Sequence, residues 1–156
     1  TRDPRDWITS TMNWANLYGK KDLVSKLGLP RLNPKMINDT EYEKLWKTFT
    51  RFEKVCWTYK TQYEIMLNDI EGDPNAKVFK FEDIFNEANG RTKAELLDFI
   101  CSYRSFNFQY AIGELNISKK VHESKKNIFP DFSDWPNEHK EKMFNICAPI
   151  ISSLGY

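Results

Sequence analysis

The segment AKVFKFEDIF, residues 76–85, is the feature that most constrains how this chain can fold. Lys80 separates Phe79 from Phe81, and the alternation follows the two-residue period of a β-strand. No other segment of adequate length shows this pattern. Because the backbone groups of a strand must pair with a neighbouring strand, one strand cannot form a sheet. We therefore expect its partner strands to lie upstream of the 156 residues.

Helical periods cover most of the remaining sequence, because apolar side chains recur every three or four residues. This spacing predicts helices over residues 4–18, 41–70 and 91–103, and a last helix between Asp134 and Gly155. Residues 107–133 show no clear period and are rich in turn formers and lysines. They are predicted to form a functional loop.

Capping residues mark the ends of these predicted helices. Thr40 and Glu43 have the spacing of a capping box at the start of the second helix, and Gly19 can close the first. Asp134 can cap the last helix, which Gly155 would end. The chain is therefore predicted to be mainly helical around a single strand.

The first two residues stand where a strand end would meet a helix start. Asp3 can cap the first helix, and Pro4 suits its first position. If Thr1 and Arg2 end a strand, the order of elements is that of an open α/β sheet. Such sheets bind phosphate groups at this edge, where a guanidinium makes bidentate contacts. The alternative is that Arg2 belongs to a solvated strand end.

The opening stretch TRDPRDWITSTMNW resembles the 3'-phosphate-binding segment of the sulfotransferases that use 3'-phosphoadenosine 5'-phosphosulfate (PAPS). That segment reads Arg-Asp-Pro-Arg-Asp, followed by a few apolar residues and a serine. In the family the arginine and the serine eight positions later hold the 3'-phosphate of the nucleotide. The resemblance therefore implies these roles for Arg2 and Ser10.

Two further segments are similar to the same family. VFKFEDIF resembles a strand that ends in an aromatic residue, Glu and Asp, and Phe81 stands where a tyrosine often approaches the adenine. Phe81 could stack on a purine but could not donate a hydrogen bond. The stretch from SKKNIF to LGY resembles the family's tail, whose basic loop folds over the nucleotide phosphates. This implies closing contacts from Ser124, Lys125 and Lys126, although the sequence is Lys-Lys-Asn rather than Arg-Lys-Gly.

The resemblance implies an α/β fold of the P-loop-like, three-layer, nucleotide-binding type. Residues 1–156 would be the helix-rich C-terminal part of a single sulfotransferase domain. The Gly-rich turn that cradles the 5'-phosphosulfate and the catalytic base would lie upstream, so no catalytic residue is assigned within this chain. His122 and His139 are interpreted as bystanders. The implied cofactor is PAPS, as a co-substrate, with no metal.

The implied function is transfer of a sulfonate group from PAPS to a hydroxyl or amine. The partners would be the adenine nucleotide donor and a small-molecule or carbohydrate acceptor. Two alternatives are a non-enzymatic, mostly helical interaction module and a relative of the P-loop nucleotide kinases. The sequence upstream of Thr1 would distinguish them, because a Gly-rich basic turn after a strand favours the sulfotransferase.

Charge and cysteine content limit the classes of binding partner and the cellular compartment that we expect. The 23 Lys and Arg residues nearly balance the 22 Asp and Glu residues, which argues against nucleic acid or an anionic membrane bound through bulk electrostatics. No stretch approaches the roughly 18 apolar residues of a membrane span. Cys56, Cys101 and Cys147 are predicted to be buried thiols, which favours a cytoplasmic location. Asn38 and Asn116, in Asn-x-Ser/Thr sites, keep the Golgi lumen as the alternative.

Overall fold

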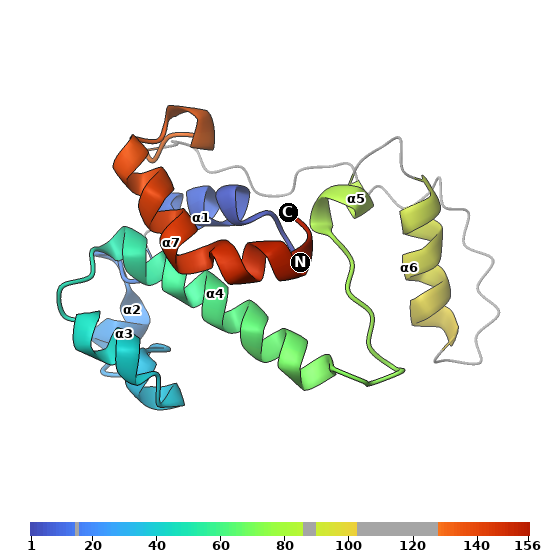
Figure 1. Ribbon diagram of the computed structural model, residues 1–156, viewed down its shortest axis with the longest axis horizontal. Coiled ribbons are helices and arrows are strands. Elements are labelled where there is room, and N and C mark those ends of the chain that lie inside the picture. Colours follow the sequence, from blue (N-terminus) through green and yellow to red (C-terminus); the bar gives the residue numbers. More distant parts are fainter. Residues whose placement is uncertain (15, 86–89, 103–127) are drawn as a thin grey trace. The chain divides into compact units, whose positions relative to one another are not determined.

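The computed structural model describes residues 1–14, 16–85, 90–102 and 128–156 (Figure 1). They contain α-helices and two 3-10 helices, η1 and η3, in the order α1 Pro4–Asn13, α2 Leu23–Lys26, η1 Pro34–Ile37, α3 Thr40–Leu45, α4 Arg51–Ile70, α5 Phe81–Phe85, α6 Gly90–Ser102, η3 Phe132–Asp134 and α7 Asn137–Leu154. The chain divides into two compact units. The large unit contains residues 4–69 and 128–156, and the small unit contains residues 1–3, 70–85 and 90–102.

The predicted α/β, P-loop-like three-layer fold is wrong, because the described residues are helical and form no strand or sheet. Residues 76–80 have no regular secondary structure, and Phe81–Phe85 forms α5. The rings of Phe81 and Phe85 lie 4.3 Å apart, as side chains one helical turn apart do. Glu82 and Asp83 stabilise the first turn of α5, because carboxylates interact favourably with the N-terminal end of a helix.

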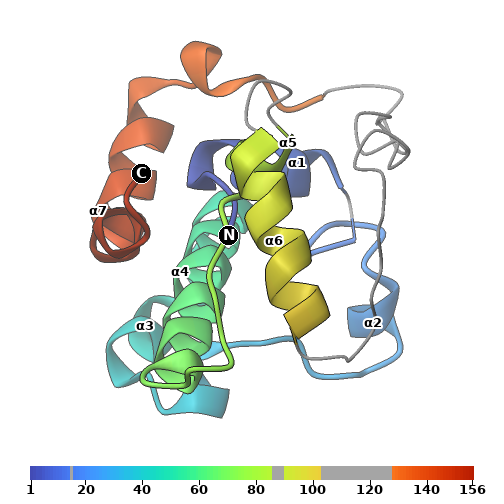
Figure 2. The same ribbon diagram turned by 90° about the vertical axis from the view of Figure 1, so that its right-hand side faces the viewer.

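The core of the large unit lies between α1, α4 and α7 (Figure 1 and Figure 2). The buried apolar side chains are Ile8 from α1, Phe52, Val55, Cys56, Trp57 and Tyr59 from α4, Trp135, and Met143, Ile146, Cys147, Ile150 and Leu154 from α7. The Cys147 thiol donates to the carbonyl oxygen of Cys56 at 3.4 Å. Burial raises the pKa of the Cys56 thiol. Cys56 and Cys147 are buried as predicted, whereas Cys101 is half-buried.

The single helix predicted over residues 41–70 is interrupted after Leu45 and begins again at Arg51. The Thr50 N–H donates to Glu53 Oε2 at 2.8 Å, and the Glu53 N–H donates to Thr50 Oγ1 at 3.3 Å. These reciprocal bonds form a capping box that starts α4. The cap of α3 is also different from the prediction, because the carboxylate of Asp39 accepts from the Tyr42 N–H.

The guanidinium of Arg51, the first residue of α4, explains why the first helix ends at Asn13 rather than near residue 18. It donates to four backbone carbonyl oxygens at and beyond the end of α1, at distances of 3.1, 2.8, 2.7 and 3.0 Å: those of Thr11, Met12, Trp14 and Leu17. The last carbonyls of a helix have no partner within the helix. Arg51 supplies these partners and joins α1 to the start of α4.

The predicted helix over 91–103 and the last helix are confirmed as α6 and α7. Gly155 ends α7 with φ of 71°, the left-handed conformation that favours glycine at a helix end. Asp134 does not cap α7, because it lies in η3, and Pro136 takes the capping position without a side-chain bond. Trp135 is 3% exposed, and its Nε1–H donates to the Pro130 carbonyl at 3.0 Å, which anchors the start of α7.

The carboxylate of Asp22 fixes the short helix α2 to the chain that follows it. It accepts from the Ser25 N–H at 3.3 Å and the Ser25 hydroxyl at 2.9 Å, and Arg31 Nη2 lies 2.6 Å from its Oδ1. Asp22 is only 3% exposed. The Arg31 guanidinium, helped by the Ser25 donors, holds the pKa of this carboxyl well below its usual range.

Replacing Arg51 tests its role between α1 and α4. Arg51→Met keeps much of the aliphatic stem but removes every guanidinium donor, so we expect a loss of roughly 2 to 4 kcal/mol in the free energy of unfolding. Urea denaturation measures this loss. The control Lys47→Met changes an exposed side chain and should alter stability by less than about 0.5 kcal/mol. Equal stability of the two variants would contradict the role given to Arg51.

Acid unfolding tests the Asp22 contacts. Because the folded-state pKa is depressed, ionised Asp22 stabilises the fold above the ordinary carboxyl pKa of about 3.9, and this contribution is lost as the pH falls below it. We expect Asp22→Asn to be less stable at neutral pH and its Tm to fall less steeply than that of the wild type below about pH 4. The control Asp69→Asn, at an exposed position, should follow the wild type. Parallel curves for wild type and Asp22→Asn would contradict the assignment.

Candidate functional site

The candidate site lies in the small unit, where residues 1–3 run beside the start of α5. The Thr1 nitrogen donates to the Phe79 carbonyl at 2.6 Å, and the Phe81 N–H donates to the Thr1 carbonyl at 2.6 Å. The two bonds are placed on either side of Lys80, as in one rung of a parallel ladder. They continue into no strand within the described residues, but they hold the opening segment against the backbone that leads into α5.

This backbone pairing places Arg2 over Phe81. The guanidinium carbon of Arg2 lies 5.1 Å from the centre of the Phe81 ring, and the Phe81 ring lies 4.3 Å from that of Phe85. The side chain of Phe81 is 41% exposed and that of Phe85 is 43% exposed. A guanidinium can stack on an aromatic face while its N–H donors point outward in the plane of the group. The arrangement therefore combines an anion-binding group with accessible aromatic surface.

Glu82 holds the other side of this site. Its Oε1 accepts from the Asp3 N–H at 2.8 Å, so the residue after Arg2 is also attached to α5. Glu82 therefore has a structural role, because it holds the opening segment against α5. Neither Glu82 nor Phe85 is identified as a site residue by the sequence. The sequence signal for Phe85 is its spacing of four residues from Phe81, which places both rings on one face of a helix.

Of the residues predicted to bind the nucleotide, the structure brings together Arg2 and Phe81. Ser10 is an exposed residue of α1 in the large unit. Ser124, Lys125 and Lys126 lie outside the described residues. The roles of these four residues in nucleotide binding stay predictions.

Of the two histidines interpreted as bystanders, the structure describes only His139. The ring of His139 lies in the large unit, 4.3 Å from the ring of Phe52 and 5.8 Å from that of Phe129. His122 lies outside the described residues. Among the residues that the structure does describe, no three His, Cys, Asp or Glu side chains gather in a way that could hold a metal ion.

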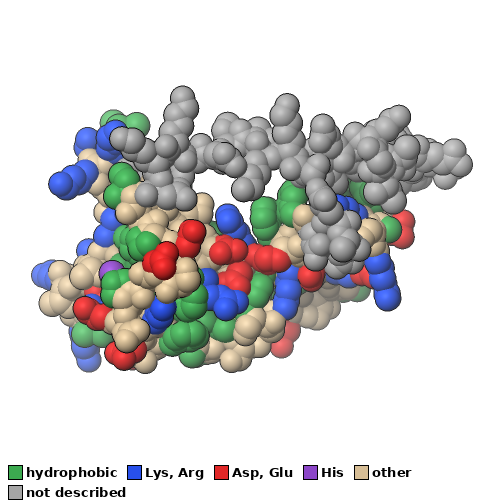
Figure 3. All heavy atoms as spheres, turned by 90° about the horizontal axis from the view of Figure 1, so that it is seen from above, with side chains coloured by type: hydrophobic (Ala, Val, Ile, Leu, Met, Phe, Trp, Pro, Cys, Tyr) green, Lys and Arg blue, Asp and Glu red, His purple; other side chains and the backbone are tan. Residues whose placement is uncertain are grey.

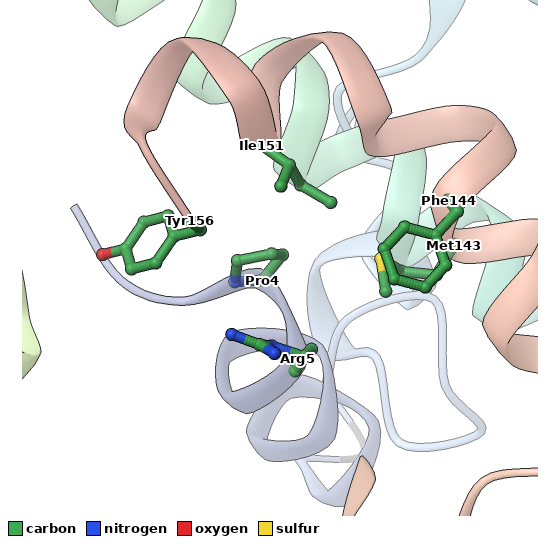
Figure 4. A pocket seen from close by; sticks show the side chains of 6 residues that line it. All are labelled: Pro4, Arg5, Met143, Phe144, Ile151 and Tyr156. Carbon is green, nitrogen blue, oxygen red and sulfur yellow. The ribbon is translucent and has the colours of Figure 1, made fainter.

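The large unit contains an apolar hollow whose empty volume, together with the open solvent at its mouth, is about 300 Å³ (Figure 4). Its lining comes from the first turn of α1, from α7 and from the residues after α7: Pro4, Arg5, Met143, Phe144, Ile151 and Tyr156. Arg5 supplies the only charge among these side chains, and its guanidinium carbon lies 5.6 Å from the centre of the Phe132 ring. The sequence did not predict this hollow, because its lining combines residues about 140 positions apart.

Charged side chains of both signs are interspersed over the described residues on the face shown in Figure 3. This agrees with the near balance of acidic and basic residues in the sequence. None of the helices in the described part of the chain is both long enough and apolar enough to cross a membrane.

Comparison with known proteins finds no relative of this chain: no protein-family model, no curated protein and no solved structure matches it.

Proposed function

We propose that this chain belongs to a PAPS-dependent sulfotransferase and binds the 3'-phosphoadenosine end of the sulfonate donor. The observation that carries the proposal is the guanidinium of Arg2 stacked 5.1 Å from the centre of the exposed Phe81 ring. The donor presents a ribose 3'-phosphate close to a purine. A site for it needs a fixed cation beside an aromatic face, and Arg2 and Phe81 provide both.

Local features support the proposal, whereas the helical fold of the described residues gives it no support. The Arg-Asp-Pro-Arg-Asp sequence that resembles the family's phosphate-binding segment contains the same Arg2 that the structure places on Phe81. The backbone bonds from Thr1 and the Asp3 N–H bond to Glu82 hold both sides of this arginine. A preorganised guanidinium binds a phosphate with less loss of side-chain entropy than a freely rotating one.

Each predicted residue has a distinct role in this proposal. Arg2 makes a bidentate contact with the 3'-phosphate, and Ser10 adds a hydroxyl donor. Phe81 stacks on the purine. Ser124, Lys125 and Lys126 close over the phosphates.

The reaction is the transfer of a sulfonate group to a hydroxyl or amine of a small-molecule or carbohydrate acceptor. The acceptor atom forms a bond to sulfur as the bond from sulfur to the 5'-phosphate oxygen breaks, and adenosine 3',5'-bisphosphate leaves. A base must take the proton of the acceptor. We assign no catalytic residue within the 156 residues, so this chain contributes nucleotide binding to the reaction.

The alternative function is a non-enzymatic helical interaction module. The predominance of helices among the described residues, with no strand or sheet, favours this alternative. A relative of the P-loop nucleotide kinases would need a GxxxxGK[ST] turn and a magnesium-binding carboxylate upstream of Thr1, and no observation on the described residues favours it. Nucleotide binding separates the sulfotransferase from the interaction module, because the module predicts none.

Isothermal titration calorimetry with two nucleotides tests the role of Arg2. The chain should bind adenosine 3',5'-bisphosphate more tightly than adenosine 5'-monophosphate, which lacks the 3'-phosphate. Arg2→Ala should weaken binding of the bisphosphate by roughly 2 to 4 kcal/mol, and Ser10→Ala should weaken it by about 1 kcal/mol. Both substitutions should have little effect on binding of the monophosphate. Phe81→Leu should weaken both nucleotides, because both contain the purine.

Arg91→Ala is the matched control for Arg2, because Arg91 is an arginine of the small unit with an 89% exposed side chain. It should bind both nucleotides as the wild type does. The proposal fails if the wild type does not distinguish the two nucleotides. It also fails if folded Arg2→Ala weakens both of them equally.

The two lysines of the predicted closing loop are tested separately by salt dependence. Lys125→Ala combined with Lys126→Ala should weaken binding of adenosine 3',5'-bisphosphate and make the remaining affinity less sensitive to ionic strength. Lys119→Ala combined with Lys120→Ala removes the same charge from the same predicted loop and serves as the control. Unchanged affinity of the Lys125 and Lys126 variant at low salt would assign that pair to solvated surface.

A further inference from the structure

Three large apolar side chains are exposed within seven residues of the large unit, in and just after α2. Leu23 is 65% exposed, Leu27 is 75% exposed and Leu29 is 55% exposed. Leu23 and Leu27 are one helical turn apart and therefore share a face. Single exposed leucines are ordinary, but a group of them marks a surface that binds another molecule or a membrane. We refer to residues 22–29 as the leucine turn.

The leucine turn is fixed at both ends by hydrogen bonds. Asp22 accepts from the Ser25 N–H at its start. At its end, the Gly28 N–H donates to the Ser25 carbonyl and the Leu29 N–H donates to the Val24 carbonyl, both at 3.1 Å, while Gly28 has φ of 71°. This is the Schellman arrangement of a helix C-terminus. The backbone of the turn is therefore already ordered before the leucines bind anything.

The exposed charges in the sequence from residue 19 to residue 38, which contains the leucine turn, are all positive. Residues 19–38 contain one acidic residue, Asp22, which is 3% exposed and paired with Arg31 at 2.6 Å. The remaining charged residues of this range are exposed lysines: Lys20, Lys21, Lys26 and Lys35. With a net charge of +1 for the whole chain, this concentration of positive charge is local.

We propose that the leucine turn docks on an anionic lipid surface. Leu23, Leu27 and Leu29 enter the boundary between the headgroups and the acyl chains, and the surrounding lysines contact the anionic headgroups. An exposed apolar face bordered by lysines is the combination that membrane-surface elements use. This inference goes beyond the proposed sulfonate transfer and does not depend on it.

The composition of the segment favours lipid over a protein partner. Energetically dominant residues of protein interfaces are enriched in Trp, Tyr and Arg, whereas interfaces are depleted in Lys. Residues 19–38 contain no aromatic residue. Their single arginine, Arg31, is already paired with Asp22. A lipid surface needs no such anchors, since it is matched by apolar area and positive charge alone.

Vesicle flotation of the full chain tests the proposal. The chain should float with phosphatidylcholine vesicles that contain phosphatidylserine, much less with pure phosphatidylcholine, and less again at high salt. Leu23→Gln combined with Leu27→Gln should lower the affinity at least about tenfold. Replacing Lys20, Lys21 and Lys26 by Gln should lower it by about fivefold for each lysine.

Matched controls separate docking by this turn from general effects. Leu45→Gln changes a leucine of α3 that is 45% exposed, and Lys44→Gln with Lys47→Gln removes exposed lysines outside the turn. Both should bind as the wild type does, and circular dichroism should show every variant folded. No binding to anionic vesicles overturns the proposal, as does equal binding to neutral vesicles or wild-type binding by the double leucine variant. If the chain does not bind vesicles and the leucine substitutions abolish its self-association, the surface is a protein interface and the proposal is wrong.

Discussion

The large unit depends on one guanidinium. Arg51 is the first residue of α4, and it donates to four carbonyl oxygens at and beyond the end of α1, so it satisfies groups that the helix itself cannot. Burial lowers the pKa of Arg51, yet the group remains positively charged at any physiological pH. Because these bonds join the end of α1 to the start of α4, the chain between them forms an excursion that contains α2, η1 and α3. The proposed lipid-binding turn lies within that excursion.

The elements that sequence patterns predicted well are those in which periodicity and end signals agree. α6 and α7 are examples, and Gly155 ends α7 as expected. The prediction of one long helix over residues 41–70 was wrong. Its apolar period continues through Trp46, Phe49 and Phe52, across the break, so periodicity could not locate the break. The signal that could have done so is the capping box of Thr50 and Glu53. The early end of α1 could not be predicted locally, because its partner Arg51 is about 40 residues away in sequence.

The prediction of a strand over residues 76–85 was wrong for a different physical reason. A short alternating segment is ambiguous, and here the last five residues close a helical turn in which Phe85 follows Phe81 at helical spacing. The sequence predicted more of the candidate site than of the strand. A motif of adjacent residues pointed to Arg2, and the structure places the Arg2 guanidinium over the Phe81 ring. The contribution of Glu82 to holding Asp3 depends on a contact between residues 79 positions apart, which no local pattern reveals. The roles of Ser10, Lys125 and Lys126 still rest on the resemblance alone.

The central claim is that Arg2 itself contacts the 3'-phosphate, and its side-chain resonance tests this most directly. In a nitrogen-15 labelled chain, the Nε–H signal of Arg2, assigned by its loss in Arg2→Lys, can be followed as nucleotide is added. The account predicts that adenosine 3',5'-bisphosphate shifts this signal and slows exchange of its proton with water, whereas adenosine 5'-monophosphate leaves it in place. An Arg2 signal that does not move while the bisphosphate saturates the chain would contradict the account.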